Sequence, residues 1–373
     1  MASSIKAQAV ATYVGQKVSA VRWRPTFKSI EESTGFVSGG WDDEPNKVCF
    51  WTIEHEEERF LRDFATSIVP TESKLAASAP VADGGNVTDI QFLDPDRFLA
   101  ALSTGTVQLW SQRDSMGEIS LVEEYRWSDL HRHRRGSASC TCLAVNHEVN
   151  SLDVVTGGED GRILVLRPGA SGPIQEIQET ESTAINGISF TKATEVVTVG
   201  MAGQLKLWDF REDSRRRASK IMHMLLEPSA LLCVDCHPDQ WHLVAAGNQD
   251  GVLSIWDLRQ EKYPVSLMES HSANVWEVKF HRHYPNNLFS CSDDGSVLHW
   301  DASAVTPVRS SDESSIYSPW LADNASSSSS DIQVSHMLPH HKLPVHSLDI
   351  LSRHLVCGSD SEAVVVVYNL TMR

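Results

Sequence analysis

A repeated unit of three short segments constrains this chain more than any other feature of its sequence. The clearest copy runs through Asn274–Phe280, Asn287–Ser292 and Ser296–Asp301, with a polar turn and an Asp-Gly turn between the segments. Such alternating segments and turns are typical of consecutive antiparallel strands. A small sheet of this kind cannot shield both of its faces from water, so copies of the unit must stack against one another.

The unit occurs seven times along the 373 residues. Besides the copy near residue 300, three are close matches and three are weaker; they span 142–166, 185–209, 231–257, 18–51, 87–110 and 345–368. Each copy closes on a large side chain, namely Trp51, Trp110, Leu166, Trp208, Trp256, Trp300 and Tyr368. The central separations of 42, 48 and 44 residues fit the ~40–45 residues of a WD40 blade.

The sequence therefore predicts an all-β fold, a single seven-bladed WD40 β-propeller over residues 1–373. The expected blades cover 16–66, 86–128, 139–178, 184–224, 230–270, 274–308, and 345–373 together with 8–14. Three long intervals are expected as polar inserts on the surface, where extra length costs little; they are 54–85, 111–139 and 302–343.

Closure of the ring is predicted from the two ends of the chain. After Tyr368 only Asn369–Arg373 remain, too few residues for a turn and a fourth strand. Residues 8–14 precede the first copy and read as a strand. We expect them to form the outer strand of the last blade, because joining the termini in this way removes an exposed edge.

A hydrogen-bonded set inside each blade is a second expectation. In WD40 repeats the closing Trp belongs to a set with His, Ser or Thr, and Asp, and the copy near residue 300 supplies His271, Ser290 or Ser292, Asp294 and Trp300. His341 has the same offset from its strand as His271. Each such hydrogen bond contributes ~1 kcal/mol. Other blades depart from the pattern: Trp256 and Trp208 are present, but Asp250 and Asp160 have no evident His, and the turn before Trp208 has no Asp.

The net charge of −17 argues against direct binding of nucleic acid. Two basic runs, His131–Arg135 and Arg215–Arg217, fall in expected loops, and solvated loop charge is the simplest interpretation of both.

Seven scattered Cys predict no disulfide framework. Neither a signal peptide nor a bilayer-spanning segment is expected. These features predict an intracellular protein without membrane insertion.

No catalytic, cofactor or metal site is expected. Cys233 and Cys236 have metal-like spacing, but strand residues three apart face opposite sides of a sheet. Cys140 and Cys142 lack further partners, and His340, His341 and His346 form a small cluster of which the blade pattern explains one. Phosphate-binding loops, zinc-protease motifs and nucleophile elbows are missing from the sequence.

Three features bear on protein partners. Arg211 and Arg259 follow Trp-Asp in the WDxR pattern of substrate receptors of cullin-4 ubiquitin ligases, although a solvated strand end is the simpler interpretation. The insert 302–343 contains serine runs, and its low hydrophobicity predicts disorder. Regulated phosphorylation of these serines is one interpretation, and a plain flexible loop is the simpler one. Trp320, in an apolar stretch of this insert, is expected to dock on the ring or on a partner.

Longer segments resemble one WD40 family in order along the chain. Tyr13–Pro25, Gly39–Asp43, Gly158–Arg162, Gly203–Arg211, Gln249–Asp257, Ser292–Ser296 and His299–Ala302 look like those of the 43-kDa nucleoporins of the nuclear pore's Y-shaped outer-ring complex. The resemblance covers residues 13 to 370 and is weakest in the inserts 54–85 and 302–343. It implies a non-catalytic scaffold at the nuclear pore of the nuclear envelope, attached to other Y-complex nucleoporins, chiefly an α-helical short-arm nucleoporin. It also implies a mitotic pool at kinetochores, with roles in pore assembly, transport and chromosome segregation.

Two other interpretations remain beside the scaffold. One is a substrate receptor of a ubiquitin ligase that uses Arg211 and Arg259. The other is a reader of basic tails through the central opening, since an acidic propeller attracts them. No obligate homo-oligomer is expected in any of the three.

Overall fold

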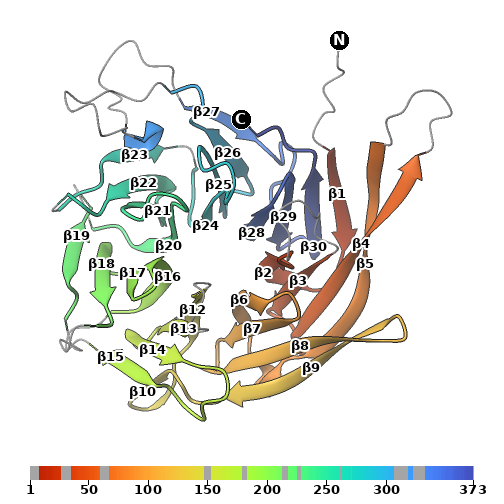
Figure 1. Ribbon diagram of the computed structural model, residues 1–373, viewed down its shortest axis with the longest axis horizontal. Coiled ribbons are helices and arrows are strands. Elements are labelled where there is room, and N and C mark those ends of the chain that lie inside the picture. The colour runs from red at the N-terminus through yellow and green to blue at the C-terminus, as the bar shows by residue number, and fades with distance from the viewer. Residues whose placement is uncertain are drawn as a thin grey trace.

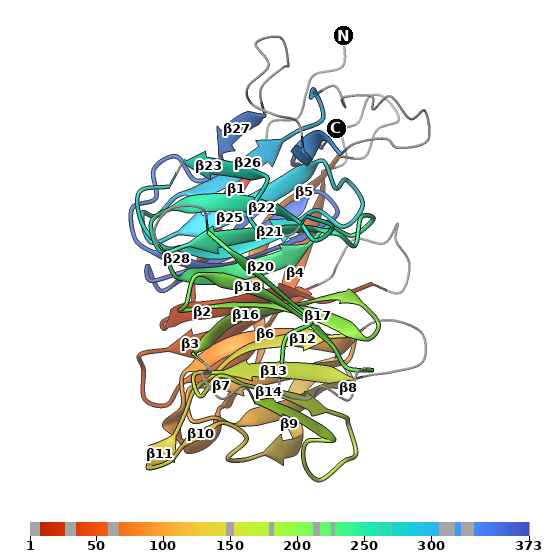
Figure 2. The same ribbon diagram turned by 90° about the vertical axis from the view of Figure 1, so that its left-hand side faces the viewer.

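The computed structural model confirms a seven-bladed β-propeller: its described residues form seven four-stranded antiparallel sheets around a central channel (Figure 1). The blades follow one another round the ring (Figure 1), and a view turned by 90° shows the same ring from its side (Figure 2). The described residues are 8–26, 35–58, 67–146, 153–178, 183–211, 217–224, 228–260, 262–269, 271–305, 318–321 and 332–372, without the side chains of 54–58 and 67–72.

In the first six blades the chain runs from the channel to the rim, one strand after another. Blade 1 contains β2 (Lys17–Trp23), β3 (Gly35–Trp41), β4 (Lys47–Glu58) and β5 (Ser67–Pro80). Blade 2 contains β6 (Val87–Asp94), β7 (Arg97–Leu102), β8 (Val107–Ser115) and β9 (Glu118–Trp127). Blade 3 contains β12 (Cys140–Val145), β13 (Val154–Gly158), β14 (Arg162–Leu166) and β15 (Gln175–Gln178).

The next three blades repeat the arrangement. Blade 4 contains β16 (Ile185–Lys192), β17 (Glu195–Gly200), β18 (Gln204–Asp209) and β19 (Lys220–His223). Blade 5 contains β20 (Leu231–Cys236), β21 (Leu243–Asn248), β22 (Val252–Asp257) and β23 (Ser266–Glu269). Blade 6 contains β24 (Val275–Phe280), β25 (Asn287–Ser292), β26 (Val297–Asp301) and β27 (Gln333–His336).

The seventh blade joins the two ends of the chain, as predicted. It consists of β28 (Val345–Leu351), β29 (His354–Ser359), β30 (Ala363–Tyr368) and, as its outer strand, β1 (Gln8–Tyr13). β1 lies antiparallel to β30, with Gln8 opposite Tyr368 and Tyr13 opposite Ala363. The expectation that residues 8–14 close the ring is confirmed.

The segments 54–85 and 111–139 are not simple surface inserts. They contain the outer strands β5 and β9 of blades 1 and 2, and a short hairpin of β10 (Arg132–His133) and β11 (Gly136–Ser137). The third segment, 302–343, contains β27 and a 3-10 turn, η2 (Pro319–Leu321). An outer strand faces solvent along one edge and on part of its surface, so its polar residues resemble those of a loop. In β9, all residues before the buried Trp127 are exposed or half-buried.

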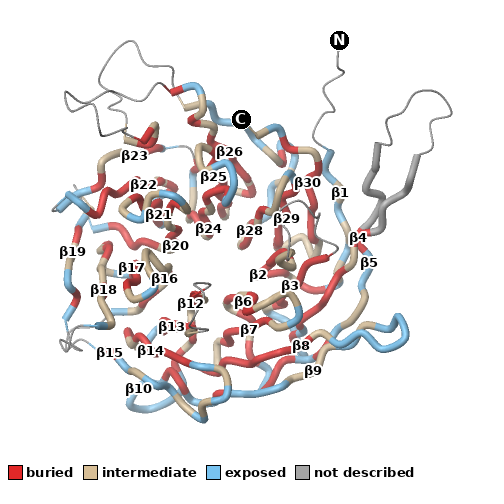
Figure 3. Tube along the Cα trace, in the orientation of Figure 1, coloured by how far each residue is buried: buried red, intermediate tan, exposed pale blue. Residues whose placement is uncertain are grey.

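The hydrophobic core is divided into seven clusters, one for each contact between neighbouring blades. The inner and middle strands are largely buried and the rim is exposed (Figure 3). Trp110 packs between blades 1 and 2, Leu166 between blades 2 and 3, and Trp208, Trp256 and Trp300 between the next three pairs. The closing side chain of each of these blades therefore fills the wedge against the preceding blade.

Tyr368 does not occupy the closing position of blade 7. Trp300 lies opposite Leu288, and the matching pair in blade 7 is Val367 opposite Leu355. Tyr368, one residue later, is buried on the other face of its sheet against blade 1. Because side chains alternate across a strand, a shift of one residue moves an aromatic ring to the opposite blade interface.

Two histidine side chains stabilise the turns that follow the inner strands β20 and β24. His237 Nδ1 accepts hydrogen bonds from the backbone N–H groups of Asp239 and Gln240, at 3.2 and 3.1 Å. His281 Nδ1 does the same in blade 6, while its Nε2 lies 2.6 Å from the carbonyl oxygen of Ser352. Both rings must therefore be neutral. Burial lowers the pKa of His237 to about 4, and it also lowers the pKa of His281.

Loss of the closing strand is expected to destabilise the whole ring. A variant lacking residues 1–15 loses β1 and exposes the edge of β30, so its thermal unfolding midpoint should fall by several degrees or more. A variant lacking only residues 1–7, which precede β1, should melt like the full chain. Equal melting temperatures of all three proteins, measured by circular dichroism, would contradict this closure.

Lowering the pH from 6.5 toward 4 should destabilise the fold, because His237 must become protonated when the chain unfolds. A free His has a pKa of about 6.5, and the folded value for His237 is about 4. Protons then bind the unfolded chain first, so the contribution of His237 is complete above pH 6.5 and is lost as pH falls toward 4, by about 3 kcal/mol. In urea denaturation, His237→Asn should flatten this dependence, whereas the control His133→Asn, on an exposed ring, should keep it.

Candidate interaction site at the central channel

The inner strands β2, β6, β12, β16, β20, β24 and β28 line the channel, which encloses a cavity of about 100 Å³. Each inner strand has a sheet neighbour on one side only. Its other edge carries backbone N–H and C=O groups that no ladder satisfies, and such groups are costly when they are buried. Side chains from the neighbouring blades must therefore supply their hydrogen-bond partners.

A β-bulge near the start of every inner strand supplies one set of these side chains. The pairing register of all seven inner strands shifts by one residue there. The residues at the bulges are Ser19, Thr88, Thr141, Asn186, Leu232, Trp276 and His346. In blades 1 to 4 the bulge side chain donates a hydrogen bond to a carbonyl of the next inner strand; the acceptors are Val87, Cys140, Ile185 and Leu231.

Carboxylates at the channel wall supply the second set. Asp89 accepts the N–H of Leu143 at 2.9 Å, from blade 2 to blade 3. Equivalent bonds from a carboxylate to the following blade join Asp235 to Phe280, Glu277 to Leu348 and Asp349 to Trp23, at 2.8, 2.9 and 2.7 Å. Four blade contacts are thus fixed by a charge-assisted hydrogen bond at the channel wall.

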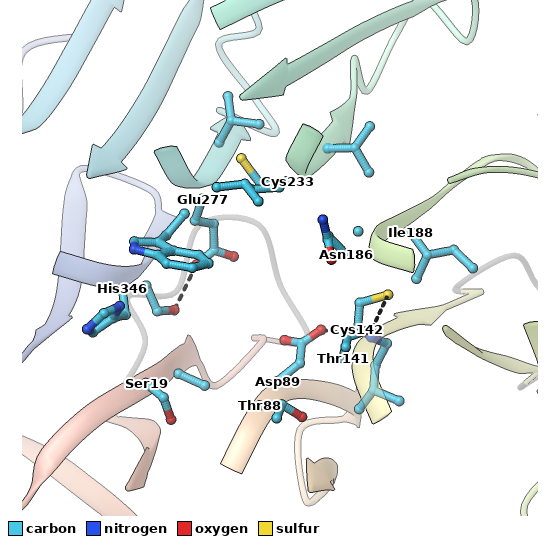
Figure 4. Close-up of a pocket in the computed structure, with 18 of the residues that line it drawn as sticks. Ser19, Thr88, Asp89, Thr141, Cys142, Asn186, Ile188, Cys233, Glu277 and His346 are labelled. Atoms are coloured by element: carbon cyan, nitrogen blue, oxygen red, sulfur yellow. Dashed lines mark hydrogen bonds between the residues drawn. The ribbon is translucent and has the colours of Figure 1, made fainter. Parts of the chain in front are cut away.

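Arg22 ties these carboxylates together. Its guanidinium lies 2.9 Å from Asp89 and 2.7 Å from Glu277, and it also donates to Ser347 Oγ at 3.0 Å. The four residues belong to blades 1, 2, 6 and 7, on both sides of the closing seam. Figure 4 shows Asp89 and Glu277 reaching the cavity from different sides. One buried cation therefore links four blades across the channel.

Burial and the neighbouring charges shift the pKa values of the residues in this cluster in opposite directions. Burial raises the pKa of the Asp89 carboxyl. Burial acts in the same direction on Glu277, but the charges of Arg22 and Lys279 and the hydrogen bonds from Ser347 and Leu348 outweigh it and lower the pKa of Glu277. Burial opposes the charge of Arg22, yet Glu277 and Asp89 raise the pKa of the guanidinium above its ordinary value. Glu277 is the ionised partner that matters most to Arg22.

The four residues expected as a set in blade 6 lie together. His271 Nε2 is 2.7 Å from Ser290 Oγ, and Trp300 Nε1 donates to the same oxygen at 3.0 Å. His271 Nδ1 lies 3.4 Å from a carboxylate oxygen of Asp294. Of the two serines left open by the sequence, Ser290 takes part, while Ser292 Oγ donates to the carbonyl of Ala273.

Blade 3 has a set that the sequence did not reveal. His131, expected in a basic loop, has a fully buried side chain, with Nδ1 2.9 Å from Asp160 and Nε2 2.8 Å from Thr156. Burial opposes ionisation of Asp160, but His131, the Arg132 N–H and Arg162 outweigh it and lower the pKa of the carboxyl. His131 was missed because it stands nine residues before Cys140 rather than four. The hairpin β10–β11 fills the difference.

The remaining blades contain partial sets. Trp208 Nε1 donates to Thr198 Oγ1 and Trp256 Nε1 to Ser254 Oγ, both at 2.9 Å. Asp250 is exposed and stands outside any such set, because Asn248 accepts the N–H groups of the turn in blade 5.

In blade 7, His341 lies 3.5 Å from Ser361. The positions that correspond to Ser290 and Trp300 are Cys357 and Val367. A complete set with His341 is therefore not formed in this blade.

Both arginines of the WDxR pattern fold back onto their own motif. Arg211 bonds to Asp209 at 2.7 Å and approaches Glu195 at 3.4 Å. Arg259 bonds to Asp257 at 2.7 Å. Their side chains are 65% and 49% exposed. The guanidinium groups stiffen the turns after β18 and β22 while one side of each stays open to solvent.

Trp320 is not a surface contact. Its side chain is 1% exposed, its Nε1 donates to the carbonyl of Pro285 at 3.0 Å, and its ring packs edge-on against Phe280. Of the two docking alternatives for this stretch, the structure shows the one on the ring. The serine runs Ser310–Ser315 and Ser326–Ser330 lie outside the described residues.

The other expected features are readily located. Arg132 to Arg135 are exposed on the β10–β11 hairpin, and Arg217 is exposed, while Arg215 and Arg216 lie outside the described residues.

Burial raises the pKa of the Cys233 thiol, and it raises the pKa of the Cys236 thiol to about 12, so neither cysteine is readily ionised. Within the described part of the chain, no cluster of three or more His, Cys, Asp or Glu is arranged to hold a metal ion. Among those same residues no helix is both long and apolar enough to cross a bilayer.

A profile of the WD domain, G-beta repeat family matches residues 262–301, which span most of blade 6. Nucleoporin Nup43 of Homo sapiens is 35% identical over 390 aligned positions, covering 96% of this chain and 98% of the relative. The chain belongs to the Nup43 family of nucleoporins. Nucleoporin Nup43 of Mus musculus is 36% identical over the same shares, and nuclear pore complex protein nup43 of Dictyostelium discoideum is 29% identical over 41% of this chain and 37% of its own length.

The sequence contains a signal for the channel cluster of Arg22, Asp89 and Glu277. Arg22 stands between the apolar residues Val21 and Trp23, and Asp89 and Glu277 each stand two residues after the first Val of their strands. A charge at the same offset in two copies of a repeat indicates a shared position facing other charges.

Removing the charge of Arg22 should be far more damaging than removing that of a neighbouring arginine. Arg22→Met leaves two buried carboxylates without their cation, so the free energy of unfolding should fall by about 3–5 kcal/mol. Arg24→Met breaks a pair with the more exposed Asp96 and should lower it by less than about 1 kcal/mol. Urea denaturation measures both.

A second substitution tests whether Arg22 and Glu277 are energetically coupled. Because Glu277→Gln removes one of the carboxylates that Arg22→Met leaves unpaired, the double variant should be more stable than the sum of the two single changes predicts. Strict additivity would show that the cluster is not coupled in the folded protein.

Proposed function

We propose that this protein is a non-catalytic scaffold subunit of the nuclear pore complex, within its Y-shaped outer-ring assembly. The observation that carries the proposal is identity of 35% to nucleoporin Nup43 over nearly the whole of both chains. On this proposal its partners are other nucleoporins of that assembly, chiefly an α-helical short-arm nucleoporin. It acts in pore assembly and nucleocytoplasmic transport at the nuclear envelope, and at kinetochores in mitosis.

The physical character of the ring supports a scaffold. Arg22, Asp89 and Glu277, the charged groups that a catalytic channel would use, are engaged with one another and with backbone groups of neighbouring blades. The blades are locked by these bonds and by strand exchange between the chain ends. A body held in this way offers several independent surfaces at fixed relative positions, which suits a subunit that joins others.

The receptor hypothesis remains the main alternative, and the contacts of its two arginines weaken it. Arg211 and Arg259 are each bound by the Asp of their own Trp-Asp pair. A ligase adaptor would have to compete with those bonds. The arginines have a sufficient structural role without a partner.

Purification from cell extract tests the two functions against each other. A tagged full-length chain expressed at its natural level should recover a set of nucleoporins, and its fluorescence should outline the nuclear rim. The double variant Arg211→Ala, Arg259→Ala should recover the same set in the same amounts. Recovery of a cullin adaptor that disappears with the double variant, together with absence of nucleoporins, would overturn the scaffold and support the receptor.

A further inference from the structure

In blades 1 to 4 the bulge side chain donates a hydrogen bond to the next inner strand. The bulge residues of blades 5, 6 and 7 do not have this role. Leu232 has no group to donate, and Trp276 and His346 make their hydrogen bonds within their own blades. Trp276 Nε1 donates to Asp293 in the β25–β26 turn, at 2.5 Å. His346 Nε2 lies 3.0 Å from Asp360 in the β29–β30 turn. Where a repeated structural role is abandoned at neighbouring positions, another role is to be sought.

Trp276 and His346 form an aromatic patch together with Trp41. The ring of His346 lies 5.2 Å from that of Trp41 and 5.8 Å from that of Trp276. Trp41 Nε1 donates to the same Asp360 oxygen that His346 contacts, at 3.2 Å. The three rings come from blades 1, 6 and 7 and are half-buried, whereas the closing tryptophans are buried. Trp276 and His346 border the channel cavity, where Figure 4 labels His346.

Acidic turns surround the aromatic patch. Asp42, Asp293, Asp360 and Glu362 all stand in the turns between the second and third strands of blades 1, 6 and 7. One described cation already uses the patch: Lys17 Nζ lies 5.0 Å from the centre of the Trp41 ring and 2.6 Å from Asp42. An ammonium group is thus held by a ring face and a carboxylate together, which is the arrangement that attracts cations.

We propose that the aromatic patch binds an arginine or lysine side chain from a basic, extended segment of a protein partner. The aromatic faces would stack on the cation and the carboxylates would neutralise it, with arginine favoured because its planar group stacks and forms two hydrogen bonds at once. A nucleic acid or an anionic lipid is disfavoured by the acidic rim and by the net charge of −17. The proposal does not depend on the scaffold role in the nuclear pore.

A peptide titration tests the patch. The probe is a fluorescein-labelled octapeptide of alternating Arg and Gly, capped at both ends, and the readout is fluorescence anisotropy with the full chain. An octapeptide of alternating Glu and Gly should not bind. Trp276→Leu should weaken binding of the Arg probe about tenfold, the scale of one lost cation–π contact at a partly desolvated site. Leucine is the bulge residue of blade 5, so the backbone accepts it.

Two further variants make the result specific. Trp241→Leu removes an exposed tryptophan from the β20–β21 turn, at the opposite end of its inner strand from the bulge, and should leave the affinity unchanged. Lys17→Ala removes the internal cation from the Trp41 ring and should strengthen binding about threefold, which loss of structure cannot do. Equal affinities of the wild-type, Trp276→Leu and Lys17→Ala proteins, or equal binding of the Glu peptide, would overturn the proposal.

Discussion

The pairing of β1 with β30 is the contact on which the rest of this structure depends. Six of the seven blade interfaces join sheets that are neighbours in the chain, and the seventh brings blade 7 against blade 1. Each blade leaves a hydrophobic face that only another blade covers, so an open ring would expose two such faces to water. Strand exchange between the termini holds the last interface and removes an edge that would otherwise pair with other chains.

Closing the ring also brings the unpaired edges of seven inner strands together at its centre. The backbone N–H and C=O groups on these edges need hydrogen-bond partners. This protein supplies them with side chains: hydroxyl and amide groups at the bulges, and carboxylates of Asp89, Asp235, Glu277 and Asp349. Arg22 neutralises part of the resulting negative charge. The channel wall is therefore primarily an element of structure. At the bulges of blades 6 and 7, Trp276 and His346 replace the bridging groups, and this is the part of the wall that we propose for recognition.

Regularities of the repeat explain where prediction from sequence succeeded and where it failed. His271 and Trp300 keep the standard spacing and lie together, while His131 stands nine residues before its strand and was read as part of a basic loop. The outer strand β5 was taken for part of an insert, and the segment of β9 was assigned both to blade 2 and to an insert, because strands at the rim contain many polar residues. Tyr368 was assigned to the closing position that the register gives to Val367. The errors at His131 and Tyr368 came from assuming a regular spacing where a hairpin or a one-residue shift intervenes.

The sequence by itself determined the number of blades, the closure by residues 8–14 and the family, because these depend on a repeat, on the length left at each end and on similarity along the chain. Only the tertiary structure decided which charges meet. Arg22, Asp89 and Glu277 lie on three strands separated by 67 and 255 residues from Arg22, and Trp41, Trp276 and His346 are equally scattered. The repeat places charges at equivalent positions, but no local pattern tells which side chains on strands so far apart will pair. That geometry arises only when the seventh interface forms.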